Sequence, residues 1–283
     1  MNRIIGLMKK YNIYPVKRLG QNFLTDENMI NRLKDAISPG SGDYIIEIGP
    51  GLGSLTETLA GNCSVLYCIE LDTKLFEVVN DRFGSFPGFF SGNFDILDFD
   101  TSAELPGYDE HKISTVKITG NLPYYITTPI IMKFLESNFN FDYMYFMMQK
   151  EVAQRILAEP GTKDYGALTV AANYYCEAKF VVNVPPHCFM PQPSVHSTFV
   201  EFKKRKVPGV EVIDKELFFK VVKAAFNQRR KCLINALTNS PLLNFSKEEI
   251  VKSVSCVVTD EKIRGECLDI NTFAKLSNIL YGS

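Results

Sequence analysis

The sequence predicts an α/β fold, a mostly parallel sheet with helices on both faces, followed by a smaller all-helical domain. Two observations predict it. Up to about residue 205, short apolar segments typical of buried strands alternate with segments whose apolar residues recur at helical spacing. Beyond residue 209, the periodic segments are all helical. We therefore predict two domains, over residues 1–205 and 206–283.

The elements of the first domain follow in order. A helix begins at Thr25 or Asp26, either of which can cap it, and ends before Pro39-Gly40. The apolar segments that we expect to form strands are 43–49, 64–72, part of 89–97, 114–120 and 141–149. Helices are expected between or after them over 52–60, 73–83 and 150–158. Two further strands, within 180–186 and 197–205, are expected to be antiparallel.

The second domain follows a linker over residues 203–209. Asp214 can cap a helix whose apolar residues share one face. Ser246 and Glu249 have the spacing of a capping box. A last apolar-periodic segment covers residues 273–280, so this domain is predicted to be helical throughout.

Composition is that of a cytoplasmic protein with no membrane association. The 283 residues are 46% hydrophobic and 22% charged, and no apolar run reaches the length of a membrane helix. Seven cysteines without zinc or CxxC spacing indicate reduced thiols. The net charge of −1 favours no partner, but basic residues cluster near Lys17-Arg18, over 203–206 and over 229–231. Each cluster alone is weak evidence for nucleic-acid binding, since solvated faces carry similar runs.

A glycine loop follows the first strand. In Glu47-Ile-Gly49-Pro-Gly51-Leu-Gly53, glycines allow a sharp turn and a close approach of a ligand to the backbone. A dinucleotide fingerprint requires glycine where Ser54 stands, and Pro50 lacks the N–H that a pyrophosphate needs. The loop therefore indicates a nucleotide-like ligand without pyrophosphate.

Acidic residues follow the next two strands. Glu70 ends the second strand and can accept hydrogen bonds from both hydroxyls of a ribose. Asp95 follows the third strand, where it can meet the exocyclic amine of an adenine. Either residue alone can be a surface acid, but the three features in register predict a nucleoside site. S-adenosylmethionine has the required adenosine and no phosphate, and we take it as the cofactor.

The segment TGNLPYYITTP, residues 119–129, ends the fourth strand at the same edge. It can be a tight turn with packed tyrosines. It also suits chemistry on adenine N6, whose lone pair is delocalised into the ring. The Asn121 side-chain oxygen and the Leu122 carbonyl can accept hydrogen bonds from that amine, while Pro123 stiffens the turn. Tyr124 offers a flat face for a flipped-out base. Such a transfer requires positioning and no metal.

Together these residues resemble a known family, the ribosomal RNA adenine N6,N6-dimethyltransferases, and especially the bacterial enzymes acting on small-subunit (16S) rRNA. The resemblance covers residues 18 to about 237, with a looser tail to 280. Its segments are RLGQNFL, EIGPGLGSLT, GNLPYYITTPI, MQKEVAQRI, EPGTKDYGALTV, FMPQPSVHS and FNQRRKCL. As a set these motifs are highly specific, and they imply a Rossmann-like class I methyltransferase sheet.

The resemblance also implies site residues and partners. Cofactor contacts are implied at Asn22, Leu24, Gly49, Gly51, Glu70, Leu71, Asp95, Ile96 and Asn121. Contacts to the target base are implied at Asn121, Leu122, Pro123 and Tyr124, with Phe189 on the other face of the base. RNA contacts are expected at Lys17, Arg18, Arg229, Arg230 and Lys231. The implied partner is small-subunit rRNA within a 30S precursor, bound by a monomer with a role in ribosome biogenesis. In GNFDIL the family more often has Gly-Asp and a small residue; we take Asp95, rather than Asn93, as the adenine contact.

Three alternatives have distinct signatures. Antibiotic-resistance methyltransferases of large-subunit rRNA have motifs similar to QHFL and NIPY at the corresponding places. This sequence has QNFL and NLPYYITTPI there, which favour the small-subunit enzyme. A non-catalytic assembly factor of the same fold would not need Glu70 and the 121–124 set. An N6-adenine DNA methyltransferase is disfavoured by the helical tail and the basic run at 229–231.

Overall fold

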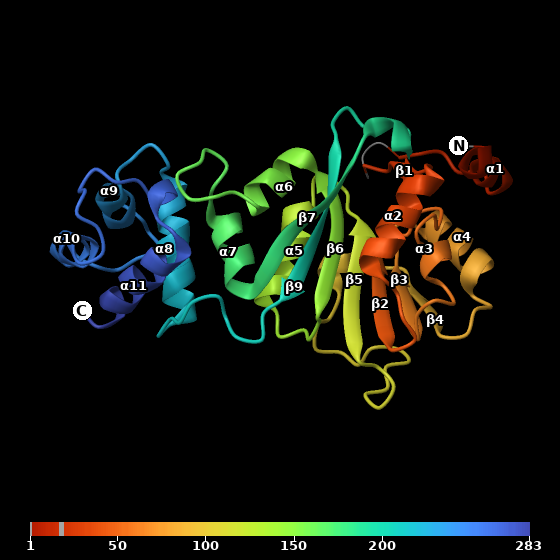
Figure 1. Cartoon of the computed structure of the whole chain (residues 1–283), viewed down its shortest axis with the longest axis horizontal. Coiled ribbons are helices and arrows are strands. Elements are labelled where there is room, and N and C mark those ends of the chain that lie inside the picture. The colour runs from red at the N-terminus through yellow and green to blue at the C-terminus, as the bar shows by residue number, and fades with distance from the viewer. Residues whose placement is uncertain (1, 17–19) are drawn as a thin grey trace. The chain divides into compact units, whose positions relative to one another are not determined.

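The computed structural model (Figure 1) describes residues 2–16 and 20–283. The chain forms two compact units, one of residues up to 153 together with Lys179–Lys204, and one of Gln154–Ala178 together with Arg205–Ser283. The break after residue 204 lies where the sequence indicates it. The second unit, however, also takes in residues 154–178, which we had assigned to the first domain. Helix α7 (Ala167–Tyr175) explains the difference, because its Val170 and Tyr174 belong to the core of the C-terminal helices.

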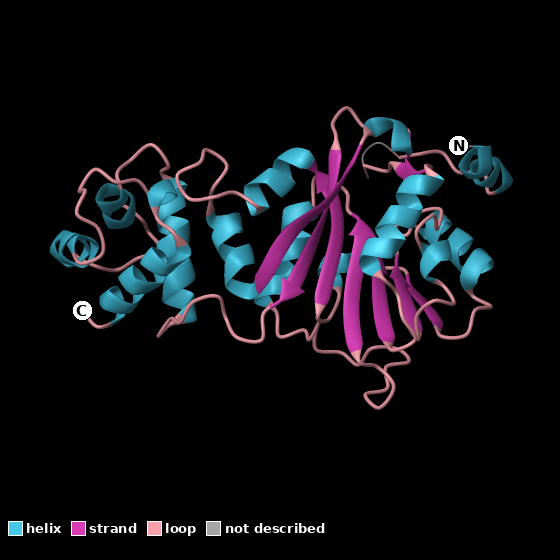
Figure 2. Cartoon of the chain, in the orientation of Figure 1, coloured by secondary structure: helices cyan, strands magenta, loops and turns pink. Residues whose placement is uncertain are grey.

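A seven-stranded sheet organises the first unit (Figure 2). Its order is β4-β3-β2-β5-β6-β9-β7. The strands are β2 (Asp43–Ile48), β3 (Val65–Ile69), β4 (Phe89–Gly92), β5 (Thr115–Asn121), β6 (Tyr143–Gln149), β7 (Cys176–Val184) and β9 (Ser197–Lys204). Strands β2 to β6 pair in parallel and β9 pairs antiparallel with β6. The predicted α/β class is confirmed. The order reverses between β2 and β5, and ligands of such sheets bind at that point, outside the carboxyl ends of the strands.

Shorter elements surround this sheet. The helices are α1 (Asn2–Lys10), α2 (Glu27–Ile37), α3 (Thr56–Leu59), α4 (Thr73–Phe83), α5 (Thr127–Glu136) and α6 (Lys150–Ile156), with one-turn helices at Ile96–Asp98 and Pro186–Cys188. Strands β1 (Phe23–Leu24) and β8 (Phe189–Met190) form a separate antiparallel pair. Asp26 caps α2 by accepting from the Met29 N–H, at 2.8 Å.

Helix α3 is shorter than the predicted 52–60. Gly53, within that range, has a φ of +78°, which a right-handed helix does not adopt. A Cβ at this position would lie 2.4 Å from the Phe83 ring of α4. The loop that precedes α3 is therefore held open by a close contact with α4 rather than wound into a helical turn.

The second unit is helical, as predicted. Besides α7 it contains α8 (Lys215–Asn227), α9 (Leu233–Thr238), α10 (Lys247–Ser255) and α11 (Ile270–Tyr281), with a one-turn helix at Gly265–Cys267. Asp214 caps α8 through the Leu217 N–H, and Ser246 and Glu249 form the capping box of α10. Phe218, Leu237 and Phe273 are fully buried in its core. Each such side chain contributes about 1.5–3 kcal/mol of transfer free energy.

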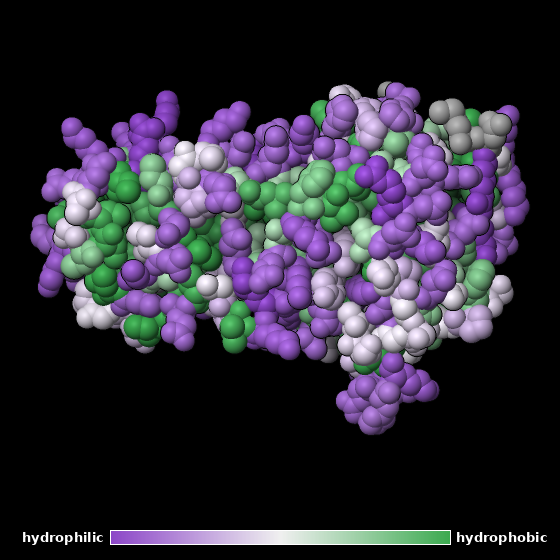
Figure 3. Space-filling model, in the orientation of Figure 1, coloured by the Kyte–Doolittle hydropathy of each residue, from purple (hydrophilic) through white to green (hydrophobic). Residues whose placement is uncertain are grey.

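A hydrophilic loop lies at the edge of the sheet where the parallel strands begin. The loop before β5, drawn in yellow in Figure 1, projects there and is hydrophilic in Figure 3. Glu104 and Tyr108 are exposed residues of this connection. Among the described helices, none combines the length and hydropathy that a membrane crossing requires.

Candidate active site

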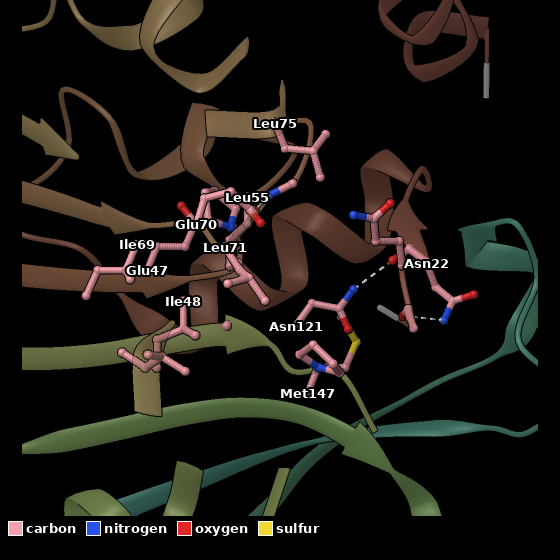
Figure 4. Close-up of a pocket in the computed structure, with 18 of the residues that line it drawn as sticks. Asn22, Glu47, Ile48, Leu55, Ile69, Glu70, Leu71, Leu75, Asn121 and Met147 are labelled. Carbon is pink, nitrogen blue, oxygen red and sulfur yellow. Dashed lines mark hydrogen bonds between the residues drawn. The ribbon is translucent and has the colours of Figure 1, made fainter. Parts of the chain in front are cut away.

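A pocket opens at the carboxyl ends of β2, β3 and β5, at the reversal of strand order (Figure 4). Its lining comes entirely from the first unit. The contributing segments are 20–24, 47–55, 69–75, 94–96 and 120–130, together with Leu33, Met147 and Phe199. The sequence predicts a nucleoside site at this edge.

The glycine loop leaves room for a ligand. Gly49 has a φ of +63°, and a Cβ added there would have no atom within 4 Å. The open space is therefore on the pocket side of the loop, which lets a ligand approach the backbone directly. Pro50 also lines the pocket and has no N–H to offer a phosphate. Both features suit an uncharged ribose more than a pyrophosphate.

Glu70, directly after β3, fixes the glycine loop and faces the pocket. One carboxylate oxygen accepts from the Gly51 N–H and the other from the Asp72 N–H, each at 3.0 Å. The residue is only 7% exposed. Burial raises the pKa of its carboxyl to about 7, although the two backbone N–H donors favour the ionised form. Each oxygen retains a second lone pair, so the carboxylate can also accept from ribose hydroxyls.

Glu47, at the end of β2, is a second buried carboxyl in the lining. Burial raises its pKa to about 7, and the charge of Glu70 adds to the effect. The Cys68 thiol donates to its carboxylate at 3.7 Å. Two carboxyls with raised pKa values at one edge indicate a functional site.

Asp95 and Asn93 take different positions. Asp95 lines the pocket with Ile96, and one of its carboxylate oxygens accepts from the Leu97 N–H at 2.9 Å. The Asn93 amide instead donates to the carbonyls of Glu70 and Leu71. Asn93 therefore ties two strand ends together, and of the two residues Asp95 is the one with a carboxylate at the pocket.

Asn121 ends β5 with its side chain in the pocket. Its amide nitrogen donates to the backbone carbonyl of Asn22 at 2.8 Å, the dashed line in Figure 4. A carbonyl only accepts, so this contact requires the NH₂ group on that side. The side-chain oxygen of Asn121 can consequently accept a hydrogen bond from another donor. The Asn22 side chain donates to the Gly20 carbonyl at 3.0 Å, which shapes the segment that carries this anchor.

Of the other predicted contacts to the cofactor and the base, Leu122 does not line the pocket, whereas its sequence neighbour Pro123 does. Leu24, Gly51 and Leu71 line the pocket, and Leu71 is 45% exposed. Pro123 lines it as well, whereas Leu122 is buried and its N–H donates to the Met147 carbonyl.

The two predicted stacking rings do not line the pocket. The Tyr124 hydroxyl lies 2.7 Å from the Ser197 hydroxyl of β9, and burial raises the pKa of Tyr124. Phe189 is 1% exposed, belongs to the core of the first unit and pairs with Leu24 in the β1–β8 ladder. A buried ring has no face available to a base, so Phe189 must move before it can stack. Contact of either ring with a base stays a prediction.

The residues predicted to contact RNA differ in what the structure shows of them. Lys17 and Arg18 lie outside the described residues. Arg229 donates to the carbonyls of Lys163 and Tyr165, and its guanidinium lies 3.6 Å from the Glu266 carboxylate. These contacts tie the exposed Arg229 side chain to the second unit, which the basic run in the sequence does not reveal, and its contact with RNA stays a prediction. Arg230 and Lys231 are exposed in the α8–α9 connection.

Four aromatic rings of the lining were not among the predicted site residues, namely Phe23, Phe94, Tyr125 and Phe199. Phe94 lies against Gly92, where a Cβ would be 2.4 Å from the ring, and stacks on Phe99 at 6.4 Å. Tyr125 lines the mouth next to Pro123. The position of Phe94 directly before Asp95 in the sequence could have indicated that it lines the pocket. Tyr125 could have been recognised because it directly follows Tyr124, but only Tyr124 was predicted as a site residue.

The fold and the site together define a class I, S-adenosylmethionine-dependent methyltransferase. Glu70, Asp95 and the open space at Gly49 suit the adenosine part of this cofactor. Residues 16–271 match the model of the ribosomal RNA adenine dimethylase family, and the chain belongs to that family. The protein is thus an rRNA adenine dimethyltransferase.

Individual relatives agree with this assignment. The chain is 43% identical over 279 residues to ribosomal RNA small subunit methyltransferase A of Listeria monocytogenes serotype 4b, covering 98% of this chain and 95% of the relative. A crystal structure of a dimethyladenosine transferase from Plasmodium falciparum has a TM-score of 0.74 at 23% identity, over 90% of this chain and 95% of that one. The 23S rRNA methyltransferase ErmE has a TM-score of 0.67 at 23% identity, over 92% and 100%. These two solved structures therefore share the fold of this chain.

Proposed function

We propose that the protein transfers methyl groups to N6 of two adjacent adenosines in small-subunit 16S rRNA. The observation that carries the proposal is the fixed orientation of Asn121, whose amide oxygen remains available at the pocket. The substrate follows from the relatives: that of Listeria is named for the small subunit. ErmE shares the fold at 23% identity, so it does not favour a large-subunit target.

The residues of the chain act by positioning. S-adenosylmethionine, when bound, supplies the methyl group on its sulfonium. Asn121 accepts a hydrogen bond from the target amine, and the carbonyl of the next residue, Leu122, is the second acceptor. These acceptors hold the amine with its lone pair directed at the methyl group, and the proton released from N6 passes to water. Positioning of this kind can lower the barrier by several kcal/mol.

The second methylation constrains the site further. A monomethylated amine has one N–H left, so it satisfies one acceptor only. A buried carbonyl left without a donor costs about 1–3 kcal/mol. We therefore expect space or a water molecule beside one acceptor, and stacking of the base to provide the binding free energy that the missing hydrogen bond no longer supplies.

We also propose how the parts divide the work. The first unit binds the cofactor and performs the chemistry, and the helical unit contacts rRNA through exposed basic residues such as Arg230 and Lys231. The substrate is the rRNA within a 30S precursor, met by a monomer in the cytoplasm where ribosomes assemble. The presence of both Glu70 and Asn121 argues against a purely structural assembly factor.

One experiment tests the proposal. Purified protein is incubated with methyl-labelled cofactor and, in parallel, unmethylated small subunits, large subunits and duplex DNA. Label in two adjacent adenines of the small subunit alone, absent with Asn121→Ala, is the expected result. Label in large-subunit rRNA or DNA contradicts the substrate assignment, and equal activity of Asn121→Ala contradicts the mechanism.

A further inference from the structure

Tyr125 is an exposed aromatic ring at the mouth of the pocket. Its side chain is 57% exposed, although it contributes to the lining. Among the described residues, the other rings that line the pocket are Phe23 and Phe199, both buried, and the half-buried Phe94. Tyr125 therefore presents more surface to solvent than the adjacent, half-buried Tyr124, whose hydroxyl lies 2.7 Å from that of Ser197.

A hydrogen-bonded turn carries this ring. The Ile126 N–H donates to the Pro123 carbonyl at 3.1 Å, and the Thr127 hydroxyl donates to the same oxygen at 3.0 Å. Thr127 is 1% exposed and begins α5, so the turn is anchored in the core. On the other side the ring lies beside Gly20, where an added Cβ would be 3.8 Å from it. The backbone that carries Tyr125 is thus fixed before a ligand binds.

The position of the ring separates it from the cofactor anchors. Glu70 and Asp95 follow β3 and β4, on one side of the strand reversal. Tyr125 follows β5, on the other side, in the turn that begins with the Asn121 amide. When a target amine occupies the Asn121 oxygen, the next nucleotide of the same strand must remain outside the pocket, because that oxygen receives one base at a time.

We propose that Tyr125 is the stacking platform for the adenine next to the target adenine. The ligand of this subsite is an unpaired purine of RNA, bound through its flat face. The inference rests on the proposed function and extends it, since each of two adjacent adenines then serves as the stacked neighbour while the other reacts. Stacking of a base on an aromatic side chain corresponds to a roughly 5- to 150-fold change in affinity.

The test is a double-mutant cycle between the ring and the neighbouring base. The enzymes are the wild type, Tyr125→Ala, Tyr125→Phe and the control Tyr108→Ala, which removes an exposed ring of the connection before β5, outside the pocket lining. The substrates are small subunits reconstituted with rRNA that carries either both adenines or one adenine beside an abasic nucleotide. Initial rates give kcat/KM for methylation of the remaining adenine, and calorimetry gives the Kd of S-adenosylmethionine.

We expect Tyr125→Ala to lower kcat/KM about tenfold on the normal particle and to show no further decrease on the abasic one. The wild type decreases by the same factor on the abasic particle, while Tyr125→Phe and Tyr108→Ala behave as wild type. If the decreases in kcat/KM caused by Tyr125→Ala and by the abasic nucleotide multiply when the two are combined, the ring and the base do not touch, and the proposal is overturned. An equal decrease in cofactor affinity also overturns it, because Tyr125 then acts as a wall of the cofactor site. Absence of methylation by the wild type would instead refute the proposed function itself.

Discussion

Replacement of Glu70 by glutamine should remove a pH dependence of cofactor binding. Burial raises the pKa of this carboxyl to about 7, so its ionised fraction rises from roughly a tenth at pH 6 to roughly nine tenths at pH 8. The ionised form is the better acceptor for ribose hydroxyls. If it is the binding form, the apparent Kd falls about tenfold over this range, because affinity scales with the competent fraction.

Glu70→Gln changes both the affinity and its slope. A glutamine keeps one acceptor oxygen but turns an NH₂ group toward the N–H of Gly51 or Asp72. Removal of a charge-assisted hydrogen bond costs about 1.5–3 kcal/mol, which is roughly a 10- to 150-fold weaker Kd at pH 8. At pH 6 the wild-type carboxyl is mostly neutral, so the difference between the two proteins should shrink.

The assay is calorimetric titration of S-adenosylmethionine at pH 6, 7 and 8, with Glu104→Gln as an exposed control at the opposite edge. Glu47 also has a pKa raised to about 7, so any slope that persists in Glu70→Gln and disappears in Glu47→Gln belongs to that residue. A folded Glu70→Gln protein with wild-type affinity and wild-type slope would refute the role assigned to Glu70.

The same carboxyl predicts the opposite trend for the stability of the free protein. A pKa above the unfolded value of 4.5 means that the folded state holds the proton more tightly. This contribution to stability is complete below pH 4.5 and disappears as the pH rises to about 7. The melting temperature of Glu70→Gln should therefore depend less on pH over that window than that of the wild type.

Three further outcomes are expected. Asn121→Ala should abolish methylation while rRNA affinity in filter binding stays nearly unchanged, because most affinity comes from phosphate contacts; a near wild-type rate would disprove the lone-pair mechanism. Neutralising Arg230 and Lys231 should reduce the log–log salt slope of rRNA binding by about 0.7–0.9 for each phosphate that these side chains neutralise in the wild type, and an unchanged slope would make them a solvated face. Ser197→Ala should release the Tyr124 hydroxyl and lower kcat with little change in the Kd of the cofactor, whereas Ser197→Thr should restore kcat; a decrease confined to the melting temperature would limit Ser197 to packing.

The sequence was most informative where strand ends and site residues coincide. Gly49, Glu70, Asp95 and Asn121 each follow or end a parallel strand, so knowing the strands was enough to place them at one edge. Of the two candidates for the adenine contact, Asp95 lines the pocket, whereas Asn93 turns to the Glu70 and Leu71 carbonyls. The adenine contact at Asp95 stays a prediction.

Sequence reasoning was weakest where a side chain has two possible partners. Arg229 was grouped with its basic neighbours as an RNA contact, which stays a prediction, and the structure adds its hydrogen bonds to the Lys163 and Tyr165 carbonyls. Phe189 was assigned to the base, and the structure adds that it is buried opposite Leu24, so its contact with a base stays a prediction. Both depend on contacts with residues distant in the chain, which local patterns do not record. Residues 154–178 were misassigned for the same reason, since α7 packs on helices that follow much later.

The pairing of β1 with β8 has a consequence for the newly made chain. The Thr25 N–H and hydroxyl both donate to the Cys188 carbonyl, across 163 residues of sequence. Between them the chain leaves the first unit at residue 154 and returns at 179. The segment that carries Asn22 therefore has no β partner until residue 190 has left the ribosome. Contacts of such long range form late. Each new copy should thus be unable to hold its cofactor firmly until more than half of the chain has been translated, and only then become competent to act on ribosomes.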